Sequence, residues 1–387
     1  MESAVTFNAL EDSHAAGMAL GKEISARLNG AVPDALVVFA SARHDYRQLL
    51  AAIQQSCHPK VLVGCSSAGE FTNLSQGEGS VSAVAFRSDG MQFVPALGQN
   101  LSRDRAAAAR QMASSFRGLR SQKYQHRTAL ILTDALAGYI DDLVERLNVE
   151  TGGTYNLFGG GAGDDAKFSQ THVFFGTDVH ADAAVALEIL SSKPLGIGVR
   201  HGWRPSGAPL RVTEASGAKV VSLNSVSAVE AFQEHAERTG QTFDPAAPLP
   251  FFLHNVLGVD AGGQFKLRVP IAVGEDGSVS CAADIPVGST VQIMSTDSAS
   301  AAEAASSALR DAISQIGPAK PGMALFFDCV ATRLRMGREF GLEMDALRKA
   351  LGDTHFAGCN TYGQIARVEG QFSGFHNCTA TVCVFPE

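Results

Sequence analysis

The sequence predicts a mixed α/β protein with parallel and antiparallel sheets, flanking helices and two domains. Three observations lead to this class. Short apolar runs alternate with helical patterns, as in strand–helix–strand units. Strands with alternating apolar and polar residues, which suit antiparallel pairing, fill the middle of the chain. A glycine-rich turn recurs three times after a strand–helix–strand unit, which indicates an internal repeat.

The first unit occupies the N-terminal quarter of the chain. Asp12 or Ser13 can cap an opening helix, and Gly30 can end it. A buried strand then leads into the first glycine turn, at 64–71, and Gly90 marks a later hairpin. The expected elements are a helix over 13–28, an apolar run at 35–40, a helix over 44–55, and strands at 61–63, 81–86 and 91–97.

The second and third units repeat this order and end in glycine turns at 159–165 and 358–365. The distances from the first strand to the first glycine are 29, 30 and 34 residues, counted from 35 to 64, 129 to 159 and 324 to 358. The first and third turns share Gly-Cys-(Ser/Asn)-(Ser/Thr)-x-Gly-(Glu/Gln), which is more than a generic α/β pattern. The expected elements are strands at 129–132, 155–158 and 171–175 with a helix over 140–147, then strands at 324–327, 355–357 and 379–385 with a helix over 344–351.

A β-rich stretch lies between the second and third units. Pro194 and Pro205 separate strands that we expect to be consecutive and antiparallel. Three prolines within 239–250 indicate a linker or exposed loop, and a long Ala-rich helix ends before Pro318, which cannot continue it. The expected elements are strands at 183–189, 195–201 and 210–213, a helix over 225–238, strands at 251–256, 265–270, 278–282 and 290–295, and a helix over 298–315.

Composition narrows the functional class. The 387 residues include 31 Lys and Arg against 39 Asp and Glu, a net charge of −8, so nucleic-acid binding is disfavoured. No apolar stretch approaches the roughly 20 residues of a membrane-spanning helix, and the N-terminus lacks the pattern of a secretion signal. Seven cysteines, an odd number scattered over the chain, do not make a disulfide framework. We therefore expect a cytoplasmic protein with reduced thiols and no membrane contact.

The glycine turns are the candidate binding site. Ligands of α/β proteins often lie beyond the carboxyl ends of the strands, and backbone N–H groups in such turns bind carboxylate or phosphate. We expect the three turns to gather into one concavity. The alternative is structural, because glycine permits a positive φ where the chain reverses. The candidate ligand-binding residues are Gly64, Cys65, Ser66, Ser67, Gly69, Gly160, Gly161, Gly163, Gly358, Cys359, Asn360 and His376.

The enzymatic alternative is a cysteine-dependent hydrolase. Cys65 or Cys359, each on a glycine-flanked turn, would be the nucleophile, with His376 as a candidate base. A small buried thiol is the more ordinary interpretation of either cysteine. Residues 161–166 formally fit a dinucleotide fingerprint, but two aspartates stand where the pyrophosphate would lie. No cysteine or histidine spacing is typical of zinc.

The order of these motifs resembles the FIST family, whose members have an N-terminal and a C-terminal FIST domain. The matching segments are 63–70, 158–165, 196–207 and 212–213 for the first domain, and 257–259, 287–291, 326–329, 358–365 and 375–379 for the second. The resemblance implies an N-terminal helix within 1–30, a FIST N-type domain over 31–222 and a FIST C-type domain over 223–387. Gln364 departs from the pattern, since an acidic residue is common there.

The resemblance implies a non-catalytic sensor that binds a small molecule and signals to a separate protein. Amino-acid-like ligands have been proposed for the family at large, and a subset resembles haem-binding nitric-oxide sensors that act on a histidine kinase or a cyclic-dinucleotide enzyme. Haem b needs one axial ligand and an apolar pocket. The candidate iron ligand is His201, which follows an apolar strand and adjoins the only tryptophan, Trp203. His376 and His254 come next, although a lone histidine at a strand end is more often only hydrogen-bonded.

Overall fold

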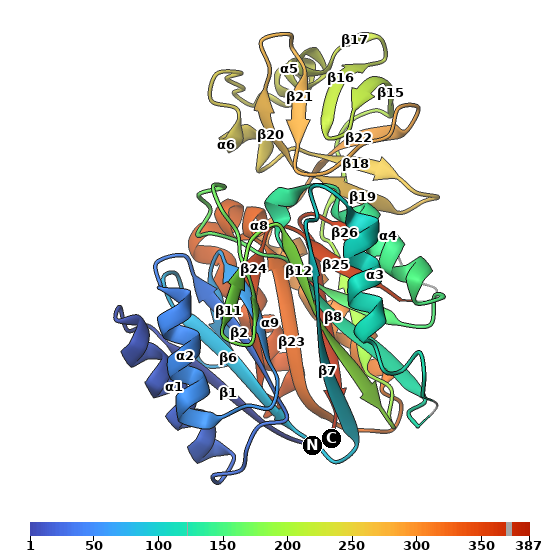
Figure 1. Cartoon of the computed structure of the whole chain (residues 1–387). Coiled ribbons are helices and arrows are strands. Elements are labelled where there is room, and N and C mark those ends of the chain that lie inside the picture. The colour runs from blue at the N-terminus through green and yellow to red at the C-terminus, as the bar shows by residue number, and fades with distance from the viewer. Residues whose placement is uncertain (122, 369–373) are drawn as a thin grey trace.

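The computed structural model describes residues 1–121, 123–368 and 374–387, so residue 122 and the part of the predicted C-terminal domain at 369–373 lie outside it. Figure 1 shows two parts: a large body with helices on its outer faces, and a smaller β-rich module above it. The module is formed by residues 204–296, and the two chain termini lie side by side at the opposite end of the body. The mixed α/β class is confirmed.

The first of the three sheets of the body has β2 and β3 as a parallel pair, with Leu36 opposite Leu62. Helices α1 and α2 cover its outer face. The strand order is β1 (Glu2–Asn8), β6 (Val81–Arg87), β2 (Ala35–Ser41), β3 (Leu62–Ser67), β10 (Val173–Phe175) and β11 (Asp178–His180), and the helices are α1 (Ser13–Arg27) and α2 (Tyr46–Cys57). The prediction of only a helix within 1–30 was incomplete, because residues 2–8 pair antiparallel with β6.

The second sheet is built in the same way around the parallel pair β8 and β9, with Thr128 opposite Asn156. Its order is β26 (Gly374–His376), β25 (Gln364–Arg367), β9 (Asn156–Gly161), β8 (His126–Thr133), β12 (Ala183–Ser191) and β7 (Met91–Gln99); the helices are α3 (Arg105–Ser115), η1 (Ala135–Ala137) and α4 (Ile140–Glu150). Helix α3 was not predicted. Its buried face is made of alanines and Met112, so its apolar periodicity is weak.

The third sheet holds the parallel pair β23 and β24, with Ala324 opposite Phe356. Its order is β13 (Gly196–Arg200), β27 (Ala380–Pro386), β23 (Pro321–Cys329), β24 (Phe356–Thr361), β4 (Glu70–Thr72) and β5 (Gln76–Gly77); the helices are α7 (Ser298–Gln315), α8 (Val330–Met336), η2 (Gly337–Phe340) and α9 (Gly341–Leu351). Helix α7 has the bounds that the sequence predicted, with Asp297 as its cap.

The three units exchange strands in a cycle. After the first glycine turn the chain leaves its own sheet, and β4 pairs with β24 of the third unit. After the third turn, β25 pairs with β9 of the second unit. After the second turn, β10 pairs with β3 of the first unit. Each glycine turn is therefore the point at which one unit crosses into the sheet of another.

The inner faces of these sheets enclose the central core. Phe39 of β2 and Phe327 of β23 meet edge to face with ring centroids 5.5 Å apart, and Phe158 of β9 lies 6.3 Å from Phe327. All three rings are fully buried. One aromatic residue from each unit thus packs at the centre of the body.

The upper module is a twisted antiparallel sheet with α5 packed on it. Its elements are β14 (Arg204–Pro205), β15 (Leu210–Ser216), β16 (Lys219–Leu223), β17 (Val226–Ser227), α5 (Ala228–Thr239), α6 (Leu249–Phe252), β18 (Val256–Asp260), β19 (Phe265–Arg268), β20 (Pro270–Val273), β21 (Val279–Cys281) and β22 (Thr290–Ser295). The predicted boundary between 222 and 223 falls at the end of β16, inside this module.

Two predictions of the middle stretch were wrong. The strands β12, β13 and β15 are not neighbours: β12 pairs with β7 and β8, β13 with β27, and β15 with β16 and β22. Residues 251–256 do not form one strand, because Phe251 and Phe252 end the short helix α6 and β18 begins only at Val256.

Candidate functional site

The three glycine turns meet at one place, where their backbones hydrogen-bond to one another. The Ala68 N–H donates to the Asn360 carbonyl (3.0 Å), and the Asn360 N–H donates to the Gly69 carbonyl (2.8 Å). The Tyr362 N–H donates to the Gly161 carbonyl (2.9 Å), and the Gly163 N–H donates to the Ser66 carbonyl (2.9 Å). Many of the N–H groups that could have held an anion are therefore already bonded to another turn.

Most glycines of the turns serve this close packing. A Cβ on Gly64 would collide with the Val38 carbonyl, and one on Gly358 would collide with the Phe326 carbonyl. In the second turn, a Cβ on Gly163 would come within 2.8 Å of the Ala68 Cβ; one on Gly160 or Gly161 would likewise meet the third turn. These five predicted ligand-binding glycines face packed protein, so the structural interpretation fits them.

The residue after the last glycine of each turn captures the segment that follows. Glu70 accepts from the Ser80 N–H (3.0 Å), and Asp164 accepts from the backbone N–H groups of 168–170. Gln364 accepts from the Thr379 N–H (3.2 Å). The side-chain Oε1 of Gln364 accepts a backbone N–H, as a carboxylate oxygen does in the other two turns. Glutamine therefore keeps this hydrogen bond although it departs from the family pattern. The sequence singled out neither Glu70 nor Asp164 for this role.

The two candidate nucleophiles are deeply buried. Cys65 and Cys359 lie inside β3 and β24, are 0% exposed and contact each other. Burial, together with the Cys65 thiol, raises the pKa of Cys359 well above its usual value. His376 is also buried, and burial lowers its pKa to about 3. A hydrolase needs an exposed, activated thiol, so the geometry argues against the cysteine-hydrolase alternative.

The two predicted serines are engaged inside the hub of turns. The Ser67 hydroxyl donates to Glu70 Oε1 (2.5 Å), and Ser66 Oγ accepts from the His172 N–H (2.9 Å). Both serines are fully buried. They hold neighbouring segments rather than presenting free hydroxyl groups to a ligand.

A cleft of about 390 Å³ opens between the first and third turns. Asn360 of the third turn and Glu70 after the first turn contribute to its wall, with Arg333 of α8. Its lining also includes Phe71, Glu78 and Phe340. Of the predicted ligand-binding residues, Asn360 lines this cleft. Gly69 is its neighbour: a Cβ added to Gly69 would lie 2.7 Å from Asn360 Oδ1.

The amide of Asn360 is the unusual feature of this cleft. Asn360 is 1% exposed, and neither its Oδ1 nor its Nδ2 has a hydrogen-bond partner within the described part of the chain. The Nε of Arg333 is also buried without a partner there, while its Nη1 pairs with Glu78. A buried polar group without a partner costs about 1–3 kcal/mol. The cleft therefore holds two donors and one acceptor that a ligand could satisfy.

Arg333 was not predicted, because no local pattern marks it. It lies 27 residues before Asn360, on a short helix after β23, and only the parallel pairing of β23 with β24 brings the two together.

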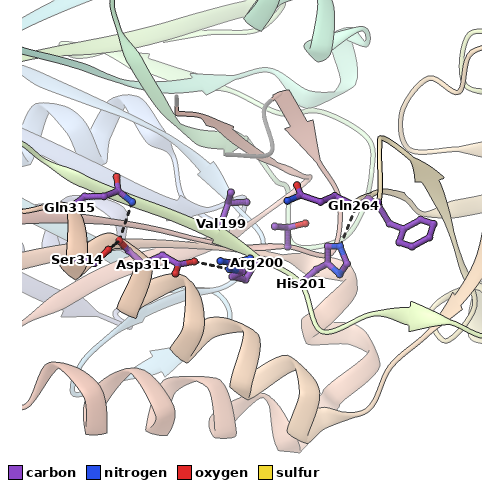
Figure 2. A pocket seen from close by; sticks show the side chains of 10 residues that line it. Val199, Arg200, His201, Gln264, Asp311, Ser314 and Gln315 are labelled. Carbon is purple, nitrogen blue, oxygen red and sulfur yellow. Dashed lines mark hydrogen bonds and ion pairs between the residues drawn. The ribbon is translucent and has the colours of Figure 1, made fainter. Parts of the chain in front are cut away.

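His201 lies at a second cleft, of about 450 Å³, between the body and the upper module. Figure 2 shows the His201 ring on the same side of the cleft as Gln264, and Arg200 facing Asp311. The His201 Nε2 lies 3.0 Å from the Phe265 carbonyl, and its Nδ1 accepts from the Trp203 N–H (3.3 Å). Both ring nitrogens are therefore used. Burial lowers the pKa of His201, which agrees with a neutral ring.

The residues at His201 do not fit an axial haem ligand. Iron binding would require a free ring nitrogen, and both make hydrogen bonds to the backbone. The walls of the cleft are polar, with Arg200, Gln264, Asp311 and Gln315 among them, whereas haem needs an apolar pocket. His254, a further candidate, is exposed and is not among the residues that line this cleft.

Two further observations limit the chemistry. Among the described residues, no three His, Cys, Asp or Glu side chains gather closely enough to hold a metal ion. In the same residues, no helix combines the length and apolar character needed to cross a membrane.

Comparison with known proteins gives matches along almost the whole chain. The FIST N domain model matches residues 34–225, and the FIST C domain model matches residues 228–367. An uncharacterised protein of Mycobacterium tuberculosis is 25% identical over 365 residues, 92% of each chain, and one of Mycobacterium bovis is 24% identical over 97% of this chain and 96% of its own. The solved structure of a cyanuric acid hydrolase from A. caulinodans aligns with all of this chain and 99% of its own at 8% identity, with a TM-score of 0.33, which is too low to support an argument.

Proposed function

The chain belongs to the FIST family, and on that premise we propose that it is a sensor that binds a small polar ligand in the cleft between Asn360 and Arg333. FIST domains are proposed to be sensory domains for small ligands. The observation that carries the proposal is the buried amide of Asn360, whose two polar atoms have no partner in the described residues. The cost of burying this amide is offset when a ligand supplies the missing hydrogen bonds.

The free groups define the chemistry of the ligand. Asn360 offers one donor and one acceptor, and Arg333 Nε offers a charged donor. A carboxylate or carbonyl group of the ligand would accept from Arg333 and from the Asn360 Nδ2. An N–H or O–H group beside it would donate to the Asn360 Oδ1. Such a molecule is small, because the cleft holds about 390 Å³.

Helix α8 connects this cleft to the surface. Arg333 pairs with Glu78, whose carboxylate is largely exposed, so a ligand can compete with Glu78 for the guanidinium. The same helix carries Leu334, which is 40% exposed. A shift of α8 on binding would alter the surface that a separate effector contacts, and we propose a cytoplasmic histidine kinase or cyclic-dinucleotide enzyme as that effector.

Haem and nitric oxide stay a prediction from the family resemblance. No step of the proposed function depends on haem, because both ring nitrogens of His201 are occupied. The cysteine-dependent hydrolase is not proposed again, because Cys65 and Cys359 are 0% exposed.

The test uses Asn360→Leu, which replaces the amide by an apolar group of similar shape. Wild-type protein purified from its own host should retain a small molecule in native mass spectrometry, and this variant should lose it. In ligand-free protein the same change should raise the free energy of unfolding by about 1 kcal/mol, measured in urea, because a buried polar group without partners is removed.

The matched control is Gln364→Leu, at another buried amide. Gln364 makes hydrogen bonds through both its Oε1 and its Nε2, so this variant should lose about 1–3 kcal/mol of stability. Retention of the same molecule by wild type and Asn360→Leu, or a loss of stability in the ligand-free Asn360→Leu variant, would contradict the proposal.

A further inference from the structure

Strand β13 forms one edge of the third sheet, and a side chain covers only part of that edge. Within the described residues, β13 pairs with β27 and with no other strand. On its other side, the Ile197 N–H donates to Gln315 Oε1 (3.1 Å), and the Ile197 carbonyl accepts from Gln315 Nε2 (2.7 Å). The amide of Gln315 thus makes the two hydrogen bonds that the backbone of a further strand would make at this position.

The next position along this edge is Val199. Backbone groups of residues two apart in a strand point to the same side, so the N–H and carbonyl of Val199 point to the same edge as those of Ile197. Outside the ladder of β13 and β27, no backbone hydrogen bond involves Val199 in the part of the chain that the structure describes. Val199 instead lines the cleft of about 450 Å³ at His201. An open N–H and carbonyl on a strand edge are a template for another strand.

The walls of the cleft add a cation and an amide to this edge. Arg200 donates through Nε to Asp311 Oδ2 (2.6 Å), and its side chain is 53% exposed. Within the described residues its two Nη groups make no hydrogen bond. Gln264 of the module also lines the cleft and is exposed. In the view of Figure 2, Val199 appears between Gln315 on one side and Gln264 on the other.

We propose that this cleft binds a short acidic segment of a partner protein, in extended conformation, as an added strand on β13 beyond Gln315. The backbone of the segment donates to the Val199 carbonyl and accepts from the Val199 N–H. A carboxylate of the segment accepts from the Nη groups of Arg200, whose fork suits a carboxylate. The volume lies within the range of small-ligand sites, about 300–1,000 Å³, so the cleft admits a few residues and not a folded domain.

The bound segment would touch both parts of the molecule, since β13 belongs to the body and Gln264 to the module. It would therefore favour arrangements in which the two parts lie close together. This proposal does not rest on the ligand cleft at Asn360, because the two clefts share no lining residue.

The experiment selects peptides on immobilised full-length protein from random acetylated pentapeptides, one set with amidated ends and one with free carboxyl ends. Peptides retained from the amidated set should carry Asp or Glu at one position about tenfold more often than in the starting set. Retention from the free-carboxyl set alone, dependent on Arg200, would identify the segment as a chain terminus. Methylating the backbone nitrogens of the best peptide should weaken its binding about tenfold or more, because the strand hydrogen bonds are lost.

Two variants test the protein side. Val199→Pro removes the N–H at the open edge and leaves the ladder with β27 intact, a position at which strands accept proline. Arg200→Gln removes the cation. Each should weaken binding of the best peptide about tenfold, measured by calorimetry. The matched control is Arg204→Gln, at an exposed arginine that does not line this cleft, and it should bind as wild type does.

Three results would overturn the proposal. The first is that wild type retains no peptide from either set. The second is that Arg200→Gln binds the selected peptide as tightly as wild type. The third is that methylation of the peptide backbone leaves binding unchanged, a result that stays decisive even if Val199→Pro does not fold. The small-molecule test at Asn360 is read separately, so either proposal can fail without the other.

Discussion

Glu70 ties the first glycine turn to the segment that follows it, and burial of its carboxyl carries an electrostatic cost. Its carboxyl accepts from the hydroxyls of Ser67 (2.5 Å) and Ser80 (2.6 Å) and from the Ser80 N–H. These donors favour the anion, but burial outweighs them and raises the pKa of Glu70 to about 7. The residue therefore changes charge within the range of pH in which most proteins are studied.

The consequence is a pH-dependent stability. Since the pKa is raised on folding, the contribution of Glu70 is fully present below its ordinary pKa of 4.5 and is lost as the pH rises through about 7. The difference corresponds to about 3 kcal/mol. We expect the stability of wild type relative to Glu70→Gln to fall by about this amount between pH 4 and pH 9 in urea titrations. Glu145→Gln, at an exposed carboxyl, should show no such trend, and a flat difference for Glu70→Gln would contradict the assignment.

At the scale of the element, the three equivalent strands β3, β9 and β24 each carry a glycine at the same point. A Cβ on Gly64, Gly159 or Gly358 would collide with the carbonyl of its partner in the neighbouring parallel strand, which is Val38, Ile131 or Phe326 respectively. The repeated glycine therefore permits the two parallel strands of each unit to approach closely. The sequence pattern alone could not distinguish this packing role from a role in ligand binding.

Gly358→Ala tests this use. Its Cβ would collide with the Phe326 carbonyl and meet the Phe71 ring, so we expect a loss of about 3 kcal/mol in the free energy of unfolding, measured by urea denaturation. Gly352→Ala is the control, because Gly352 has φ +59° but nothing within 4 Å of a Cβ. That variant should lose about 1–2 kcal/mol through backbone strain alone. Equal losses in the two variants would show that packing at Gly358 is unimportant.

Local elements could be predicted from the sequence, and their partners could not. Helix α7 has the predicted bounds because its signals are local: Asp297 caps it and Pro318 follows it. The three repeats were also visible as strand–helix–strand patterns. By contrast, β4 pairs with β24, a partner nearly 300 residues away in the chain, and no periodicity indicates such an exchange. The site residues depend on the same exchange, so Asn360 could be proposed from its turn, but Arg333 could not.

At the scale of the whole molecule, cyclic strand exchange makes the body one unit, and a buried ion-pair cluster helps to attach the upper module to it. Asp141, at the start of α4 in the body, accepts from Lys266 Nζ (2.9 Å) and Arg268 Nη2 (2.5 Å) of β19 in the module. It also accepts from the Phe375 N–H (2.9 Å). The Arg268 side chain is only 3% exposed, so this ion pair is shielded from water.

Asp141→Asn should therefore loosen the module from the body. Burial alone would raise the pKa of Asp141, but Arg268, Lys266 and the Phe375 N–H outweigh burial and lower the pKa. The carboxylate is therefore charged near neutral pH. Its contribution to the stability of the folded protein is lost only as the pH falls below the ordinary pKa of 3.8. Near neutral pH the variant leaves the buried guanidinium of Arg268 without a carboxylate, which costs about 3–5 kcal/mol.

In calorimetry, we expect the unfolding transition of Asp141→Asn to split in two, with the upper module melting first. In limited proteolysis, we expect faster cleavage near residues 201–203 and 296–297, where the chain passes between the two parts. Asp142→Asn is the matched control, since Asp142 pairs with Arg105 and Arg146 near the surface and should cost less than about 1 kcal/mol. A single transition with unchanged protease sensitivity in Asp141→Asn would mean that the apolar cluster around Trp203 and Cys378, rather than the buried ion pair, holds the module in place.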